Sequence, residues 1–464
     1  MGRRTRGFLG VVVVASAASL VPAANSAADW LTYGYSVSRS GLNPSEKTLT
    51  TGNVRSLKQR WSARVGGRID AQPVVATGVQ VGPGRTPTRV VYIGDENGHF
   101  VAVNAANGRV IWRRKLGAVR TSCSDLPSYG ITGTPQISRS RHSIFVVSKG
   151  KASELDLATG RTKHKWVITK DPKHNHNWSA LTVSHGILYV ALAGICDTEP
   201  YRGQLVATRI KTRKRVARWY VTGSKGPFGG GIWSFGGVSA DSGGNIYVAT
   251  GDAAGPKQHS HYAEHVVRLT SHLKVRSSNY PGVSGRDADF GATPLLYHAP
   301  GCPSQLAVGN KFGSFFVYNR SRIGRGPVQR IRLGGSIDGQ RALVGTAAYW
   351  PGRRMLYVSN PRPRGKYRPG IVAFRVTSKC RLATAWNNRG PWNLTSSPTV
   401  ANGVVYYGTG LHHKVVALNA RTGKRLKSLN VGGAIFGAPS VIGGVVYAGA
   451  WDGRLHAFRV PAAP

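Results

Sequence analysis

The chain of 464 residues is poor in acidic residues and in methionine, with 18 Asp and Glu against 63 Lys and Arg and only 2 Met. The formal net charge is +45, or +42 without the three arginines of residues 1–28. Such a surface attracts polyanions, and the attraction weakens as the salt concentration rises. No long segment has apolar residues at helical spacing, which argues against a helical domain.

Cysteine is also scarce, and its spacing excludes two kinds of site. The chain has no Cys-x-x-Cys-His motif, so no c-type haem is expected, and its four cysteines are too dispersed for a zinc site. In an oxidising compartment they predict two disulfides, with three possible pairings. The four residues are Cys123, Cys196, Cys302 and Cys380.

The first 28 residues have the layout of a secretory signal peptide. A basic start is followed by an apolar stretch at 8–21 and by small residues at 26–28. The apolar stretch is too short for a good membrane span. We therefore expect residues 1–28 to be a signal peptide, no transmembrane segment, and a protein that is secreted or associated with the cell envelope.

A repeated pattern runs along the rest of the chain. The copy at 91–112 reads VYIGDENGHFVAVNAANGRVIW: an apolar run, a turn, a second apolar run, then Gly and Trp. Eight such units can be counted, each with room for four short strands. Strands of alternating polarity joined by Gly-rich turns predict an all-β fold, an eight-bladed β-propeller.

The last unit, from 436, has room for only three strands before 460, whereas residues 57–67 resemble the end of the first unit. We predict that this N-terminal strand completes the C-terminal blade and closes the ring, which leaves no exposed sheet edge. The propeller would span 57–464, and residues 29–56 would cross one of its faces. The Trp near the end of five units (Trp61, Trp112, Trp166, Trp219, Trp386) is expected to pack between blades. Cysteines in neighbouring units suggest the pairs Cys123–Cys196 and Cys302–Cys380.

The repeat at 98–112 resembles that of pyrroloquinoline-quinone (PQQ) enzymes, the quinoprotein alcohol dehydrogenase family. The opening at 29–34 is also similar to the start of these proteins. The same repeat occurs in non-enzymatic relatives such as the outer-membrane assembly propeller, and a fold alone does not fix a function.

This resemblance implies a site on the propeller axis. Trp233 stands where the family has the Trp on which the quinone stacks, and Lys311 matches the family's basic residue beside the quinone. Asp252 stands at the position of a calcium ligand, and Glu199 lies one residue out of register with another. PQQ and calcium are the cofactors implied.

Other positions depart from the family. The place aligned with the catalytic aspartate holds Thr270, which cannot act as a carboxylate base, and the family's adjacent cysteines are reduced to Cys123. Asp289 is an alternative base, although it can equally cap a turn. The histidines at 259, 261 and 265 lack a recognisable metal-binding spacing, so we expect a polar loop there.

Two functions remain open from the sequence. One is a PQQ-dependent oxidoreductase for alcohols or sugars that uses an external electron acceptor. The other is a non-catalytic propeller that binds anionic polymers or proteins of the cell envelope. In both cases we expect a monomer without specific nucleic-acid binding.

Overall fold

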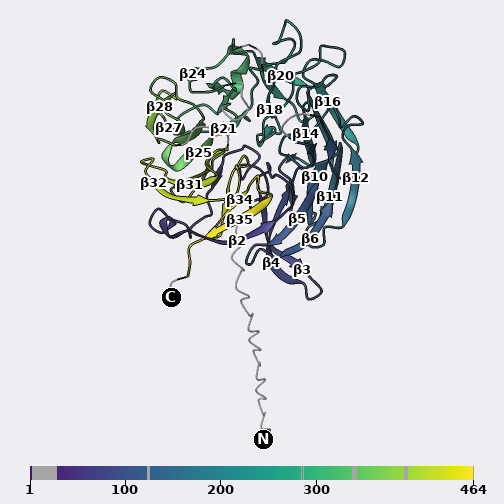
Figure 1. Cartoon of the computed structure of the whole chain (residues 1–464), viewed down its shortest axis with the longest axis vertical. Helices are drawn as coiled ribbons and strands as arrows, with labels where there is room; N and C mark the ends of the chain where they lie inside the picture. The colour runs from purple at the N-terminus through teal and green to yellow at the C-terminus, as the bar shows by residue number, and fades with distance from the viewer. Residues whose placement is uncertain are drawn as a thin grey trace.

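The computed structural model describes residues 1–2, 29–122, 126–283, 285, 287–336, 342–390 and 396–462. Eight blades of four antiparallel strands stand around a ring (Figure 1); the strands of each blade follow one another in the chain, except that β2 is the fourth strand of blade 8, and β1 adds a parallel strand beside β29 of blade 7. This confirms the predicted eight-bladed all-β propeller. Most of the predicted signal peptide, 3–28, lies outside the described residues.

The strands of the blades have the following bounds. Blades 1 and 2 contain β3 (Val74–Val81), β4 (Thr86–Gly94), β5 (His99–Asn104), β6 (Val110–Lys115), β9 (Gln136–Ser138), β10 (Ser143–Ser148), β11 (Lys151–Asp156) and β12 (Thr162–Val167). Blades 3 and 4 contain β13 (Thr182–Ser184), β14 (Ile187–Leu192), β15 (Gln204–Arg209), β16 (Arg215–Tyr220), β17 (Ser239–Ala240), β18 (Ile246–Ala249), β19 (Val266–Leu269) and β20 (Val275–Asn279). Blades 5 and 6 contain β21 (Leu295–Tyr297), β22 (Gln305–Gly309), β23 (Ser314–Asn319), β24 (Gln329–Arg332), β25 (Ala348–Trp350), β26 (Met355–Asn360), β27 (Gly370–Val376) and β28 (Leu382–Asn387). Blades 7 and 8 contain β29 (Thr399–Ala401), β30 (Val404–Gly408), β31 (Lys414–Asn419), β32 (Arg425–Asn430), β33 (Ser440–Ile442), β34 (Val445–Gly449), β35 (Arg454–Arg459) and β2 (Lys58–Arg64).

The remaining elements are short. They are β1 (Leu42–Asn43), β7 (Val119–Arg120), β8 (Ser128–Tyr129), and the 3-10 helices η1 (Val54–Ser56), η2 (Arg320–Arg325) and η3 (Pro351–Arg353). No helix in the described part of the chain is long and apolar enough to cross a membrane.

The burial of each strand follows from its place in the blade. The second strands β10 and β14 are buried along their whole length, because neighbouring blades cover both faces. The fourth strands, such as β6, alternate between exposed and buried positions because they lie at the outer rim.

The ring closes where the two ends of the chain meet. Strand β2 pairs with β35 from Lys58 opposite Arg459 to Arg64 opposite Arg454, and so supplies the outer strand of blade 8. This is the closure predicted from the short last unit. Because of this pairing, β35 is not left as an unpaired edge strand of blade 8.

The recurring Trp and Gly of the repeat are partners across blade boundaries. The Trp61 Nε1 donates to the Ala105 carbonyl of blade 1 at 3.0 Å, and the Trp112 Nε1 donates to the Leu157 carbonyl of blade 2 at 3.0 Å. A Cβ on Gly108 would lie 2.8 Å from the Trp61 ring, and the φ of Gly108 is +77°. The position therefore needs glycine both for its turn and for the close approach of the indole.

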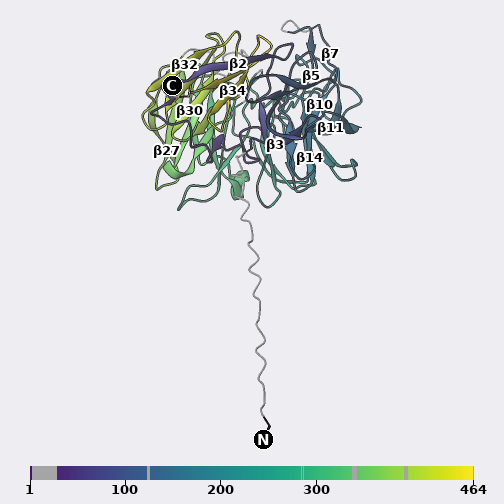
Figure 2. The ribbon, with the colours of Figure 1, turned by 90° about the horizontal axis from the view of Figure 1, so that it is seen from below.

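The N-terminal segment touches every blade, and the side view of Figure 2 shows the ring that it crosses. Residues 30–43 hydrogen bond to the first strand of each blade in turn. The pairs are Trp30–Val75, Leu31–Ile137, Arg39–Thr182, Val37–Ala240, Ser38–Leu296, Ser40–Tyr349, Gly41–Val400 and Asn43–Val441. Seven of the eight contacts fall on the second residue of a first strand and that of Arg39 falls on the first residue of β13, so the segment crosses the axis beyond the loops that precede the first strands.

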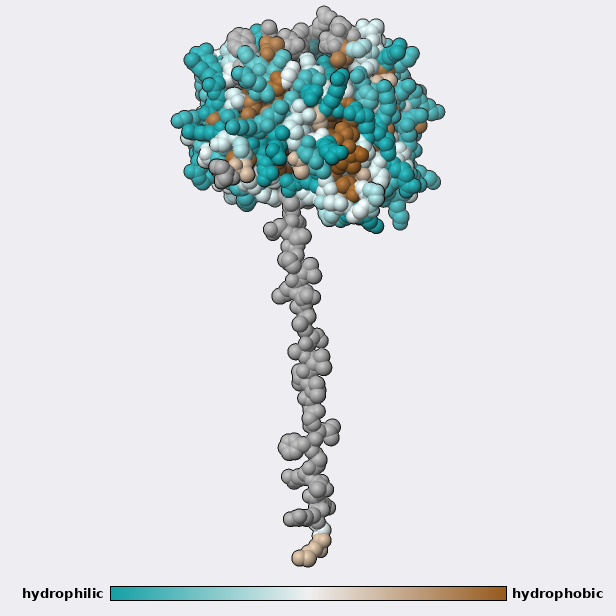
Figure 3. Space-filling view, turned by 60° about the horizontal axis from the view of Figure 1, so that its bottom comes forward, coloured by the Kyte–Doolittle hydropathy of each residue, from teal (hydrophilic) through white to brown (hydrophobic). Residues whose placement is uncertain are grey.

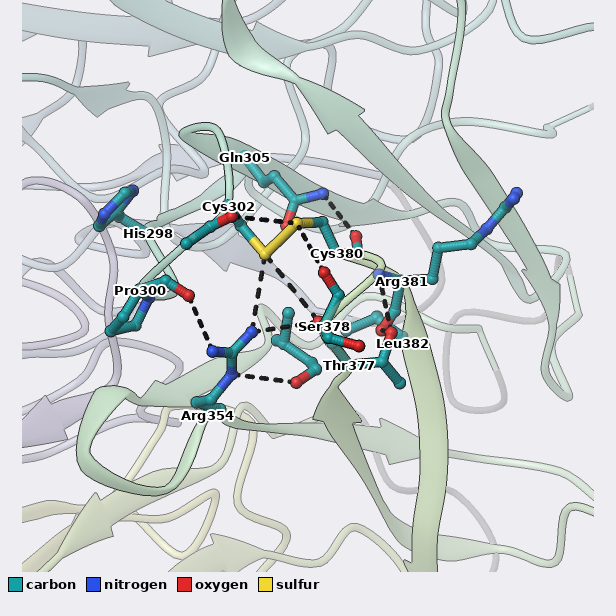
Figure 4. The surroundings of a disulfide bond; sticks show 12 residues. His298, Pro300, Cys302, Gln305, Arg354, Thr377, Ser378, Cys380, Arg381 and Leu382 are labelled. Carbon is teal, nitrogen blue, oxygen red and sulfur yellow. Dashed lines mark hydrogen bonds between the residues drawn. A yellow bond between two sulfur atoms is a disulfide. The ribbon is translucent and has the colours of Figure 1, made fainter.

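A disulfide joins blades 5 and 6 (Figure 4). It connects Cys302 in the β21–β22 hairpin to Cys380 in the β27–β28 turn, which is the neighbouring-blade pair expected from the sequence. Arg354 crosses the same boundary and donates to the Pro300 carbonyl at 2.8 Å. Cys196 is also disulfide-bonded, whereas its expected partner Cys123 lies outside the described residues.

Arg39 provides the most direct test of where the N-terminal segment lies. Its guanidinium is fully buried and donates hydrogen bonds within the segment and to blades 3 and 4. The acceptors are Thr32, Tyr33, Leu181, Thr182 and Val238.

We predict that Arg39→Met lowers the free energy of unfolding by roughly 3 kcal/mol or more, because several buried acceptors lose their donor. Urea titration measures this loss, and Arg55→Met, which removes an exposed arginine, is the control. Equal stability of the two variants would contradict the assignment.

Candidate functional site

The direction of the strands brings a defined set of loops together around the axis. Because the four strands of a blade are antiparallel, the first strand begins and the second strand ends at the same end of the ring. Trp233 precedes β17 and Asp252 follows β18, while Asp289 precedes β21 and Lys311 follows β22. Blades 4 and 5 therefore present these four residues together, at the end of the axis that the N-terminal segment leaves open.

The four residues form one cluster with a fifth, Asp287. The Lys311 Nζ donates to Asp289 Oδ2 at 2.6 Å and also to Asp287 Oδ1. The backbone N–H of Asp252 donates to Asp289 Oδ1 at 2.8 Å. One oxygen from each of the three aspartates lies within 4.8 Å of the others, and among the described residues this is the sole group of three potential metal ligands.

Glycine explains how the loops can approach so closely. A Cβ on Gly251 would lie 2.1 Å from Asp289 Oδ1 and 2.8 Å from the Trp233 Nε1. The residue before Asp252 must therefore be small for the indole and the carboxylate to share this space.

The half-buried Trp233 ring lies beside the cluster. The Lys311 Nζ is 5.9 Å from its centroid, and the rings of Trp178 and Tyr201 lie at 5.8 and 5.9 Å. The Trp233 Nε1 is buried without a hydrogen-bond partner. An indole face beside a cation, with a donor still unused, suits a planar anionic ligand.

Crowded carboxylates in a poorly hydrated site share their protons unequally. Burial first, and the neighbouring Asp289 second, raise the pKa of Asp252 to about 8 and that of Asp287 to about 7. Burial alone would also raise the pKa of Asp289, but the Lys311 ammonium brings it down to about 2. Burial lowers the pKa of Lys311, yet the two carboxylates outweigh burial and raise that pKa above its ordinary value. The site is therefore anionic overall around one fixed cation.

Of the five residues proposed from the sequence, the structure brings together Trp233, Lys311 and Asp252 from the resemblance and the alternative base Asp289, but not Glu199. Glu199 is exposed in the turn before Pro200. Asp197, two residues earlier, is also exposed by surface area, but it accepts a hydrogen bond from the Tyr201 hydroxyl at 2.9 Å, and desolvation followed by the charge of Asp289 raises its pKa. The acidic residue that faces the cluster from blade 3 is thus Asp197.

Asp287 is the residue that the sequence comparison missed. Thr270, which aligned with the family's catalytic aspartate, lies in the β19–β20 hairpin, where its N–H donates to the Lys274 carbonyl. The Asp287-Ala288-Asp289 spacing was the available signal, because two carboxylates so close in sequence can both approach one neighbour from the turn at Asp287, whose φ is +60°. Lys311 contacts both carboxylates of this pair.

The histidine loop before β19 makes ordinary packing contacts. The His259 ring stacks on Tyr280 at 4.6 Å, and His265 Nδ1 contacts the Ala263 carbonyl at 2.6 Å. These contacts agree with a polar loop.

The opposite wall of the axis is aromatic. Phe235 of blade 4 reaches Phe436 of blade 8 at 5.9 Å, and Phe436 stacks on Trp451 at 4.7 Å. The Arg68 guanidinium covers the Trp451 ring at 3.6 Å and pairs with Asp70. Nothing in the local sequence indicated that blades 4 and 8 meet here, since the contact depends on ring closure.

Comparison with known proteins identifies the family. A family model described as outer membrane protein assembly factor BamB matches residues 50–226 and 375–461, more than half of the chain. The chain belongs to this family of PQQ-type propellers.

Named relatives extend the comparison. A polyvinylalcohol dehydrogenase of a Pseudomonas species is 24% identical over 90% of this chain and 72% of its own length. A polyvinylalcohol dehydrogenase of Sphingopyxis sp. (strain 113P3) is 26% identical over 81% of this chain and 60% of its own length, so this chain spans less than two thirds of that protein. A europium-containing methanol dehydrogenase superposes with a TM-score of 0.72 at 16% identity, over 93% of this chain and 98% of that one. At such identity the structural likeness establishes the fold alone.

His176 packs against Trp178 at the edge of the site. It also makes the stability of the folded protein depend on pH. Its buried ring lies 5.5 Å from Trp178, and its Nε2 is 2.8 Å from Thr132 Oγ1. Burial lowers the pKa of His176 to about 3, so the imidazole is neutral in the folded protein. Between pH 3 and about 6.5 the unfolded chain binds a proton here that the folded protein does not, and stability falls as the pH falls.

We predict that this histidine costs the protein about 2 kcal/mol of stability between pH 7 and pH 5. Urea titrations at the two pH values measure the loss, and His176→Gln, whose amide can still reach Thr132, should show a loss smaller by that amount. An equal loss in the wild type and the variant would show that His176 does not titrate on unfolding.

Proposed function

We propose that this propeller is a PQQ-dependent oxidoreductase that oxidises alcohol groups at the axial site of blades 4 and 5. The observation that carries the proposal is the combination of the Trp233 ring, the adjacent Lys311 ammonium and the three clustered aspartates. The named dehydrogenase relatives support the same reaction class.

The residues present fit a quinone that carries carboxylates. Trp233 offers a flat face and an unbonded Nε1, and Lys311 offers a positive charge 5.9 Å from that ring. Planar anions bind well between an aromatic face and a cation. Trp233 and Lys311 would hold the quinone, which supplies the electron acceptor for alcohol oxidation when bound.

The three aspartates fit a hard cation. Their oxygens lie within 4.8 Å of one another, and carboxylates are the ligands that Ca²⁺ prefers. Three carboxylates beside one ammonium leave two negative charges when all are ionised, which favours a divalent or trivalent ion. Calcium is the ion implied by the sequence resemblance, and the europium-containing relative makes a trivalent lanthanide the natural competitor.

The chain itself supplies a base for the alcohol proton. Asp287 is half-buried and its pKa is raised to about 7, so its carboxylate can accept a proton near neutral pH. Asp289 is almost fully buried and is held ionised by Lys311, so we assign it a positioning and metal-binding role instead of the catalytic role first considered.

The substrate class follows from the relatives and from the aromatic wall. Polyvinyl alcohol is the substrate named for two relatives, and its hydroxyls stand on a hydrocarbon backbone. The partly exposed rings of Phe235, Phe436 and Trp451 offer apolar contacts for such a backbone. We propose secondary alcohols, including polymeric ones, as substrates, with electrons leaving to an external acceptor and with a secreted or cell-envelope location.

The first test concerns the metal. Terbium(III) bound beside Trp233 should emit when the indole is excited, and added Ca²⁺ or La³⁺ should displace it according to the site's preference. Asp252→Asn removes one of three charged ligands, and we predict a loss of terbium affinity of at least about tenfold, or 1.4 kcal/mol. Asp171→Asn, outside the site, is the control. Equal affinity of Asp252→Asn and the wild type would refute the metal site.

The second test concerns the quinone. Metal-loaded protein should bind PQQ, seen as quenching of Trp fluorescence, and should reduce a dye with polyvinyl alcohol or simple secondary alcohols as donors. We predict that Trp233→Leu weakens PQQ binding about tenfold or more, whereas Trp350→Leu on blade 6 leaves it unchanged.

Asp287→Asn separates binding from chemistry. At a metal concentration that saturates the variant, checked by terbium emission, it should still bind PQQ but should lose most of its turnover, because an amide cannot accept the alcohol proton. If the wild type binds no PQQ at micromolar concentration, the enzyme proposal fails, and the binding propeller without catalysis becomes the remaining function.

A further inference from the structure

The axial site does not explain the large positive net charge of the chain. Part of this charge belongs to basic residues that line cavities. Three pockets, which we call the rim pockets, lie between adjacent blades. The first and third are each lined by residues at or just past the end of one blade's outer strand and by the third and fourth strands of the next blade, at the boundaries of blades 2 and 3 and of blades 6 and 7. The second is lined by the third and fourth strands of blade 5, by Val283 from the segment after blade 4, and by Arg364 from the β26–β27 loop of blade 6.

The first rim pocket is a cavity of about 460 Å³ lined by Lys170, Arg202, Arg215 and Arg218. The Arg218 guanidinium donates to the Ile168 carbonyl at 2.7 Å, while its buried Nε has no partner. The single acidic residue in the lining, Asp171, is nearly half exposed and pairs with His174. Four cations thus face this cavity with one distant counter-charge.

The second rim pocket, of about 390 Å³, is lined by Arg330, Arg332 and Arg364, and no acidic residue is among its described lining residues. Burial and the charges of the other two arginines lower the pKa of Arg330. Mutual repulsion of this kind is relieved when an anion enters the pocket.

The third rim pocket, of about 230 Å³, repeats the arrangement with Arg389, Lys414, Arg425 and His412. Its described lining also lacks acidic residues. The same composition therefore recurs in three pockets that share no sequence beyond the blade repeat.

All three rim pockets are built mainly at one end of the ring. Third strands begin, and fourth strands end, at the same end as the axial site, because successive strands of a blade are antiparallel. Lys170, Arg332 and Arg389 all lie at or just past the end of a fourth strand. Figure 3 shows hydrophilic residues over most of the face that it draws. Part of the positive charge of the chain lines the three rim pockets at the axial-site end of the ring.

We propose that the rim pockets bind successive phosphate groups of a linear polyanion that lies across this face of the propeller. Three or four cations converge on each cavity, which is more than the two oxygens of one carboxylate can engage. Phosphate groups offer more acceptor oxygens, and arginine binds them with two parallel hydrogen bonds. Repetition around one end of the ring suits a polymer with repeated charges. The inference is independent of the quinone.

The test uses the full mature chain and inorganic polyphosphate as the probe. The triple variant Lys170→Gln, Arg332→Gln, Arg389→Gln removes one exposed cation from each rim pocket. The matched control Arg109→Gln, Arg161→Gln, Arg421→Gln removes three exposed arginines from the turns between third and fourth strands, at the opposite end of the ring. Both variants lose the same net charge.

We expect the rim variant to bind fluorescent polyphosphate at least about tenfold more weakly than the wild type near 0.1 M salt, with a log–log salt dependence shallower by about 2. The control should stay within about twofold of the wild type. Equal losses of affinity in both variants would show that net charge alone explains the binding, and this would overturn the proposal.

Competitors decide the chemistry of the polymer. Polyglutamate and single-stranded DNA of matched charge should displace polyphosphate less well than unlabelled polyphosphate does. Equal displacement by polyglutamate, or no binding of polyphosphate at 0.05 M salt, would each overturn the assignment of phosphate groups as the ligand. Stronger displacement by DNA would support phosphate recognition and make a polynucleotide the preferred polymer.

Discussion

The architecture depends on one pairing, that of β2 with β35. A ring of eight blades is stable only if the first and last blades meet, and here the meeting is made by a strand from the N-terminal part of the chain. Each Trp–Gly contact at a blade boundary also needs a neighbour on the other side, so the boundary between blades 8 and 1, where Trp61 meets Gly108, exists only in the closed ring. The aromatic wall formed by Phe235 and Phe436 depends on the same closure.

Closure also gives the two ends of the axis different roles. Residues 30–43 bridge the first strands of all eight blades at one end, with the buried Arg39 guanidinium supplying five hydrogen bonds. The loops at the other end are not covered by this segment, and they hold the polar residues of the axial site. In a chain with 18 acidic residues, three lie close together there and two of them contact Lys311, which is costly unless they hold a cation.

The family resemblance predicted the place of the candidate site more accurately than it predicted the individual residues of that site. Trp233, Asp252, Asp289 and Lys311 come together as their positions in the repeat predict, because the start of a first strand and the end of a second strand always face the axis. Glu199 was proposed although it lies one residue out of register with the family, and Thr270 stands where the family has its catalytic aspartate. Register along a loop does not fix which side chain faces the axis, so Asp197 and Asp287 were recognised only from the fold.

The sequence by itself determined the strands, the number of blades and the closure, because each follows from a local alternation of apolar residues and from turns that repeat in every unit. Only the tertiary structure decided which charged groups meet. Asp252 and Asp287 belong to loops of adjacent blades, and each rim pocket joins residues of adjacent blades. Contacts of this kind depend on loop paths and blade spacing, which no local pattern of residues encodes.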